Sequence, residues 1–192
     1  MPTVHFNPSR GRSHPIRRRS ALSLATFVGI DTAGESLDLA RELAGPGSRC
    51  EFLEMDARDL HFEDGAFDVT VCVQNGISAF GVDPLEVLRE ALRVTRPGGK
   101  VLLSSYAEQF WPHRLEWFEA QSRQGLVGAI DSSVTGAGVI VCRDGFRAGV
   151  MTPSGFQELC AQVPVAPLLT EVDGSSLFCE IIAPAADPRA VT

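Results

Sequence analysis

The chain has 192 residues, which is enough for one α/β domain with a sizeable core and too few for two such domains. A formal net charge of −7 does not favour a nucleic-acid partner, and no apolar run is long enough to span a membrane. The five cysteines form no C-x-x-C pair, which predicts a reduced, cytoplasmic protein without a metal site.

The first residues differ from the rest of the chain. Residues 1–26 carry five arginines and no acidic residue, and residues 3–6 have the composition of a short strand. A solvated basic tail is the first interpretation, and an organellar transit peptide or a nucleic-acid arm are the alternatives. We treat residues 1–26 as an atypical basic segment, partly disordered or a degenerate first βα unit, and residues 27–192 as the folded domain.

A regular pattern starts at Phe27. Residues 27–31 form a short apolar run that ends on the carboxylate of Asp31, as a buried parallel strand does. Thr32 and Glu35 have the spacing of a capping box, which predicts a helix over residues 33–44. Residues 50–55 follow as a second strand, which ends at Asp56.

Strands and helices then alternate, as in a doubly wound sheet. An aspartate followed by proline, Asp83–Pro84, predicts the start of a helix that runs to about Val94. The further elements are a strand at 67–73 that ends at Gln74, a turn at 97–99, a strand at 100–105 and a helix at 112–124.

The C-terminal third favours antiparallel pairing. Arg143-Asp144-Gly145 and residues 173–176 each separate two apolar runs, and each pattern predicts a hairpin. A short helix is predicted to start at Thr152–Pro153 between the two hairpins. The predicted fold class is therefore α/β, a three-layer, Rossmann-like, doubly wound sheet that is mostly parallel with an antiparallel C-terminal hairpin strand.

Four segments in this order resemble the class I S-adenosylmethionine-dependent methyltransferases. They are Val28–Asp31, Met55–Leu60, Phe67–Val69 and Leu92–Lys100, and the resemblance covers about residues 27–182. It implies the strand order 3-2-1-4-5-7-6 with strand seven antiparallel. It also implies that S-adenosyl-L-methionine is the cofactor and methyl donor.

The resemblance assigns donor-binding roles to six residues. Asp31, with Thr32 beside it, would accept hydrogen bonds from both ribose hydroxyls. An ionised carboxylate suits this role because its oxygens are acceptors only. Asp56 would accept a hydrogen bond from the adenine amino group, and the Ala57 backbone N–H would donate one to a ring nitrogen. Gln74 and Asn75 would line the methyl-donor and acceptor site. The alternatives are a helix-dipole acid for Asp31, a turn aspartate for Asp56 and a capping amide at 74–75.

Aromatic residues follow the strand at 100–105. They form either a lid over a small-molecule acceptor or a helix face that packs on the sheet, and we favour the helix face. His113 is a candidate base because its unperturbed pKa lies near neutrality, and Tyr106 is a second candidate catalytic residue. The residues concerned are Tyr106, Phe110, Trp111, His113, Arg114 and Trp117.

The glycine-rich loop of the family is missing from its expected place, about twenty residues before Asp31. Residues 7–11 stand there, with a proline and an arginine where backbone must approach the donor. Three explanations are open: loss of the loop and of donor binding, a late start or frame change in the gene, and an unusual loop. We favour the second, which would be excluded if no reading frame upstream of Phe27 encodes such a loop.

The sequence therefore predicts an S-adenosylmethionine-dependent methyltransferase that acts on a small-molecule acceptor. No nucleophilic side chain is required, because alignment of donor and acceptor supplies most of the acceleration. One alternative is a methyltransferase-like scaffold that binds a protein partner but no donor. Another is an NAD-binding domain, which also places an acid after its second strand.

Overall fold

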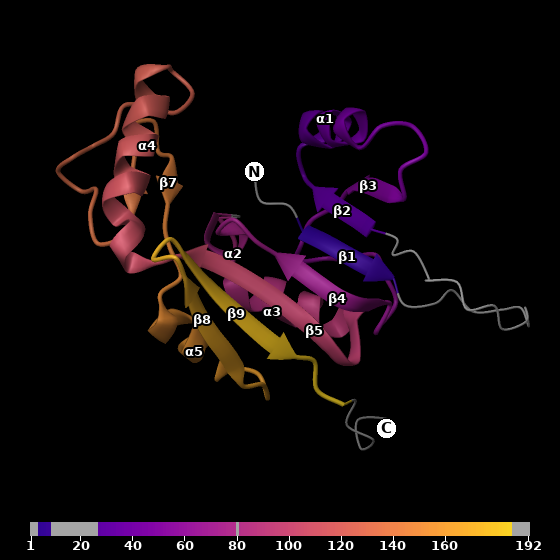
Figure 1. The fold of residues 1–192 in the computed structure, drawn as a ribbon. Coiled ribbons are helices and arrows are strands. Elements are labelled where there is room, and N and C mark those ends of the chain that lie inside the picture. The colour runs from indigo at the N-terminus through magenta and orange to yellow at the C-terminus, as the bar shows by residue number, and fades with distance from the viewer. Residues whose placement is uncertain (1–3, 9–26, 80, 186–192) are drawn as a thin grey trace, which may run out of the picture.

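The computed structural model describes residues 4–8, 27–79 and 81–185 of the chain. Within these residues a seven-stranded sheet has the order β3-β2-β1-β4-β5-β9-β8 (Figure 1). This is the strand order that the family resemblance implies. The strands are β1 (Val4–Pro8), β2 (Phe27–Asp31), β3 (Cys50–Glu54), β4 (Phe67–Cys72), β5 (Thr95–Tyr106), β8 (Pro167–Val172) and β9 (Ser176–Ile182).

The direction of β1 departs from the expected fold. β2 pairs in parallel with β3, and β4 with β5, but β1 is antiparallel to both of its neighbours. Val4 therefore lies opposite Ile30 and Cys72, so β1 begins where the carboxyl ends of β2 and β4 lie. A parallel or an antiparallel β1 would satisfy the backbone hydrogen-bonding groups of β2 and β4. Strand pairing alone therefore does not determine the direction of β1. The predicted antiparallel strand seven is β9, which is confirmed, and β1 is a further antiparallel strand that the resemblance did not imply.

The helices lie on both faces of the sheet. α1 (Gly34–Ala44) connects β2 to β3, and α3 (Pro84–Val94) lies between β4 and β5 in the chain, toward the opposite edge. Because such crossovers are right-handed, these two helices cover opposite faces. Leu37 of α1 is buried, whereas Leu43 is 79% exposed.

The main core lies between the sheet, α3 and α5 (Pro153–Cys160). Asp83 caps α3 by accepting the N–H of Leu85, and Thr152 caps α5 by accepting the N–H of Gly155, as the sequence predicted. Each cap satisfies an N–H group that the first helical turn leaves without a partner. Among the fully buried side chains are Phe67, Leu88, Val101, Phe156 and Ile181.

The turn at 97–99 is built into β5. Gly98 has a φ of +74°, and a Cβ on Gly99 would lie 2.6 Å from the Asp68 carbonyl oxygen. Glycine is therefore required here for close backbone packing.

Residues 111–148, which we call the insert, stand away from the sheet (Figure 1). The insert contains α4 (Trp111–Arg123) and the predicted first hairpin, β6 (Ile140–Val141) with β7 (Arg147–Ala148). It has a small core of its own, in which Phe118 packs against Ile140, Cys142 and Ala148. The prediction that this helix packs its aromatic face on the sheet was wrong, because the hairpin covers that face.

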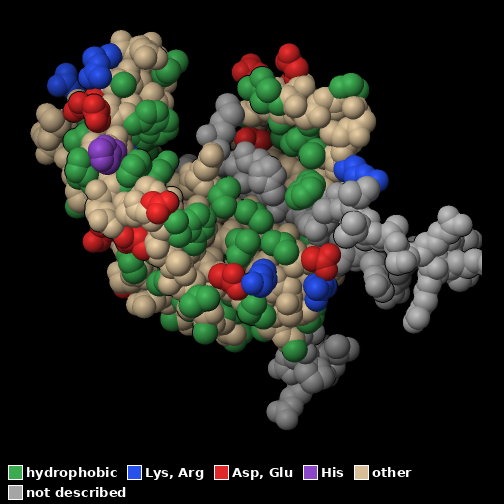
Figure 2. All heavy atoms as spheres, in the orientation of Figure 1, with side chains coloured by type: hydrophobic (Ala, Val, Ile, Leu, Met, Phe, Trp, Pro, Cys, Tyr) green, Lys and Arg blue, Asp and Glu red, His purple; other side chains and the backbone are tan. Residues whose placement is uncertain are grey.

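The second predicted hairpin is formed by β8 and β9. Its inner side chains join the main core, whereas Leu168, Val172, Phe178 and Ile182 are exposed. Figure 2 shows hydrophobic side chains gathered on this outer face. Glu180, which lies between Phe178 and Ile182 on β9, forms an ion pair with Lys100 of β5. None of the helices within residues 27–185 has the length and apolar character needed to cross a membrane.

Candidate donor and acceptor sites

The carboxyl ends of β2 and β3 lie side by side, so Asp31 and Asp56 follow neighbouring strand ends. Asp31 is paired with Glu54 in the parallel register, and its carbonyl oxygen accepts the Met55 N–H at 3.0 Å. The Asp31 side chain is half-buried, and its Oδ1 accepts the Ala33 N–H at 2.9 Å. Its Oδ2 has no hydrogen-bond partner among the described residues, so it is free to accept hydrogen bonds from a ligand.

Thr32 does not form the predicted capping box. The helix N-cap is Ala33, without a side-chain cap, and the Thr32 side chain is exposed. Asp31 takes the Ala33 N–H in an Asx turn, and this local bond replaces the threonine cap.

Asp56 is held by its own neighbour. Its Oδ1 accepts the Arg58 backbone N–H at 2.8 Å, and its Oδ2 accepts Arg58 Nη2 at 2.7 Å, while Arg58 Nε lies within 3.2 Å of both oxygens. These hydrogen bonds from Arg58 lower the pKa of Asp56. The carboxylate is thus occupied by Arg58, and Ala57 packs against the edge of the main core. Both side chains of the ion pair are more than a third exposed, so the pair is a weak, displaceable one.

Replacing Arg58 with glutamine is expected to raise the pKa of Asp56 toward its ordinary value, because the charged donors are lost. Carboxyl-carbon NMR titration measures this directly. Arg89→Gln, in the same groove, is the control and is expected to leave Asp56 unchanged.

The lowered pKa of Asp56 makes the stability of the fold depend on pH. Because folding lowers the pKa of Asp56, the pair stabilises the fold above the unfolded-state pKa. That contribution is lost as the pH falls through the folded value. Arg58→Gln should therefore flatten the acid limb of the stability curve, and an unchanged pKa of Asp56 would contradict the pairing.

Gln74 and Asn75 follow β4 at the switch point of the sheet, as predicted. Both have positive φ angles, 56° and 64°. The buried Asn75 amide donates to the Gly149 carbonyl at 2.9 Å and accepts from Ser105 Oγ at 2.7 Å. The side chain of Asn75 therefore connects the end of β4 to β5 and to Gly149, directly after the insert, which is the capping role left open above. Gln74 has an exposed side chain that lines a groove with Tyr106 and Trp117.

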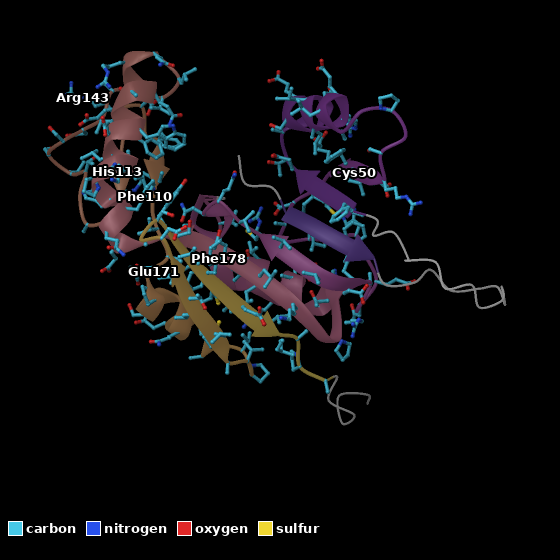
Figure 3. The ribbon with its side chains drawn as sticks, in the orientation of Figure 1. Cys50, Phe110, His113, Arg143, Glu171 and Phe178 are labelled. Carbon is cyan, nitrogen blue, oxygen red and sulfur yellow. The ribbon has the colours of Figure 1, made fainter. Side chains whose placement is uncertain are left out.

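Tyr106, the last residue of β5, lies where three cavities meet. Its ring stacks on Phe110 with centroids 5.8 Å apart, and Phe110 lies 5.5 Å from the ring of His113. Figure 3 shows Phe110 and His113 at the base of α4. The two predicted catalytic candidates, Tyr106 and His113, thus line one cavity together with Trp117.

Arg114 is the largest of the fully buried side chains. Its Nη1 donates to the Gly138 carbonyl at 2.7 Å, and its Nη2 donates to the carbonyls of Ala148 and Gly149 at 2.8 and 2.9 Å. The guanidinium carbon also lies within 6.0 Å of the ring centroids of three aromatic residues, which are Tyr106, Trp111 and Phe118. Sequence reasoning placed Arg114 near the acceptor but gave no signal for this role, which depends on carbonyls far along the chain.

Parts of this chain are similar in sequence to known methyltransferases. Residues 10–103 match a family model described as a methyltransferase domain, a range that includes Asp31, Asp56, Gln74 and Asn75. A demethylmenaquinone methyltransferase of Clavibacter sepedonicus is 34% identical over 87 residues, 45% of this chain and 35% of that protein. The ubiquinone/menaquinone biosynthesis C-methyltransferase UbiE of Bdellovibrio bacteriovorus is 28% identical over 148 residues, 68% of this chain and 60% of that protein.

Solved structures share the fold. A SAM-dependent methyltransferase of Methanosarcina mazei has a TM-score of 0.60 at 19% identity, covering 83% of this chain and 82% of that one. A Burkholderia thailandensis N1-methyltransferase, solved with 1,6-didemethyltoxoflavin and S-adenosylhomocysteine, has a TM-score of 0.51 at 14% identity, covering 82% of this chain and 60% of that one. The chain spans between about a third and two thirds of the length of the two curated relatives named above.

Proposed function

We propose that this chain, of which residues 10–103 match the methyltransferase-domain family model, transfers a methyl group from S-adenosylmethionine to a small-molecule acceptor. The observation that carries this proposal is Asp31, half-buried at the end of β2 with an acceptor oxygen to spare. A ribose diol offers two hydroxyl donors, and a carboxylate with an open oxygen suits them.

The other predicted donor contacts fit the nucleoside in part. Asp56 and Ala57 lie beyond the neighbouring strand end, where an adenine would approach, but Arg58 must first leave the carboxylate. An exposed pair of this kind is weak, so a bound nucleoside can displace Arg58. The residues present are therefore compatible with the donor.

The bound donor would supply an electrophilic methyl group. The residues of this chain would orient the acceptor beside it, and the aromatic walls of the cavities at Tyr106 would exclude water from it. His113 lines this cavity, and one of its ring nitrogens would take the proton that the acceptor loses.

The lining also favours a planar acceptor. Tyr106, Phe110 and Trp117 present rings to the cavity, and rings stack well on a flat ligand. The names of the two curated relatives above contain demethylmenaquinone and ubiquinone/menaquinone, which are quinones with a planar ring.

Isothermal titration calorimetry with S-adenosylhomocysteine tests the donor site on the full chain. Micromolar binding is the expected result. NADH titration is the control for the alternative nucleotide, and it should show no heat of binding. Binding of NADH without S-adenosylhomocysteine would overturn the proposal.

A second candidate function is a scaffold that has the fold but binds no donor. It is favoured by the direction of β1, because the chain begins rather than ends that strand beside Asp31 and Cys72. A loop that follows β1 in this direction would lie at the amino ends of β2 and β4, away from Asp31. No heat with either nucleotide, from a protein shown to be folded, would favour this candidate.

A further inference from the structure

A cavity of about 320 Å³ lies between the end of β5 and the insert. Its walls are mainly apolar and aromatic and include Tyr106, Trp111, Ala137 and Val150. Its charged lining residues are Arg114, which is 2% exposed, and Glu108, which is exposed. A largely apolar space with one buried charge is the usual form of a site that orients a small ligand.

No acidic side chain among the described residues pairs with the charge of Arg114. None of the ion pairs found within residues 27–185 includes it, and its partners are three carbonyl oxygens and three aromatic rings. An arginine stays protonated at neutral pH, so a full positive charge is buried here. Buried charges are normally paired, because an unpaired one loses its hydration without a compensating Coulomb attraction.

One donor of the same guanidinium is also left over. The Nε–H of Arg114 is buried and has no hydrogen-bond partner among the described residues. A buried polar group without a partner is rare in native proteins and calls for a specific explanation. A ligand oxygen in the adjoining cavity, which Arg114 lines, would supply the missing negative charge.

We propose that this cavity is a subsite for a planar ligand with an anionic oxygen, and that Arg114 binds that oxygen. The ligand class is an aromatic carboxylate, phenolate or enolate, whose ring lies against Trp111 and Tyr106. This proposal adds the chemical class of the acceptor to the proposed function. It rests on that function only where it identifies the bound ligand as the methyl acceptor. Arg114 is then a binding residue that also holds the insert in place.

The test compares benzoate with benzamide, its neutral isostere, on the full chain carrying Trp117→Phe. Trp111 is then the only tryptophan, and quenching of its fluorescence reports on the cavity. Benzoate is expected to bind at least about tenfold more tightly than benzamide, since a charge-assisted hydrogen bond is gained. Equal affinities would overturn the inference, as would binding of neither ligand to the folded protein.

Two variants test whether benzoate binds in this cavity while Arg114 stays in place. Glu108→Gln takes a negative charge from the rim and should strengthen benzoate binding about twofold while leaving benzamide unaffected. Glu116→Gln, an exposed change on α4 outside the cavity lining, is the matched control and should change neither affinity. Equal effects of the two variants on benzoate would contradict a local subsite.

The outcome is separable from that of the donor titration, because benzoate binding requires no S-adenosylhomocysteine. Charge-selective binding without donor binding would keep the anion subsite and remove the methyltransferase assignment. Donor binding with equal benzoate and benzamide affinities would keep the enzyme and remove the subsite.

Discussion

Replacing Asp31 with asparagine is expected to weaken S-adenosylhomocysteine binding by at least about tenfold, the value of one lost charged hydrogen bond. The amide keeps an oxygen for the Ala33 N–H, so α1 should still begin where it does. What is lost is the negative charge and the second acceptor that the ribose diol would use. Calorimetry on the two proteins measures the difference.

The control for this variant is Asp38→Asn on α1. Asp38 is an exposed carboxylate that pairs with Arg41 on the same helix, so its loss should leave donor affinity unchanged. An unchanged affinity in Asp31→Asn would exclude the ribose role and leave Asp31 as a turn-forming residue.

Arg114→Met is expected to destabilise the protein by about 3 kcal/mol, because it removes three charge-assisted hydrogen bonds to carbonyl oxygens. For a chain of this size, that corresponds to a fall in Tm of roughly 10 °C. Methionine keeps much of the length and apolar volume of the side chain, so the effect reports the lost hydrogen bonds rather than a large cavity.

The matched control is Arg123→Met on the same helix. Arg123 is exposed and makes only a long pair with Glu119, so its replacement should change stability by less than about 0.5 kcal/mol. Differential scanning calorimetry on both variants decides the question. Equal melting temperatures would show that the carbonyl contacts of Arg114 contribute no net stability.

The strands, caps and hairpins of this chain could be predicted because their signals are local. Asp83 before Pro84 starts α3, and the turn at 143–145 separates β6 from β7. The periodicity of the apolar runs then identifies which segments become strands. The family resemblance supplied the order of these strands in the sheet.

The errors concern relations between distant segments. The direction of β1 depends on how it reaches the centre of the sheet, and the packing of α4 depends on a hairpin about twenty residues further on. Thr32 failed as a cap because the side chain of Asp31, one residue earlier, was better placed. Competing partners of this kind have no signature in a single sequence.

The candidate site was predictable to the level of strand ends. Asp31, Asp56, Gln74 and Asn75 all follow strands of the sheet, and Tyr106 ends another. What the sequence did not show is which of these side chains the protein already uses. Arg58 binds Asp56, and Ser105 binds Asn75, so Asp31 is the carboxylate left with an open oxygen.

The five cysteines differ in their accessibility to a thiol reagent. Cys72, Cys142, Cys160 and Cys179 are buried, and burial raises the pKa of Cys72 to about 12, whereas Cys50 is exposed on β3 (Figure 3). Maleimide should therefore modify one thiol in the native protein and five after denaturation. Labelling stoichiometry thus counts unfolded molecules, and a dye on Cys50 marks the outer edge of the sheet without any engineered residue.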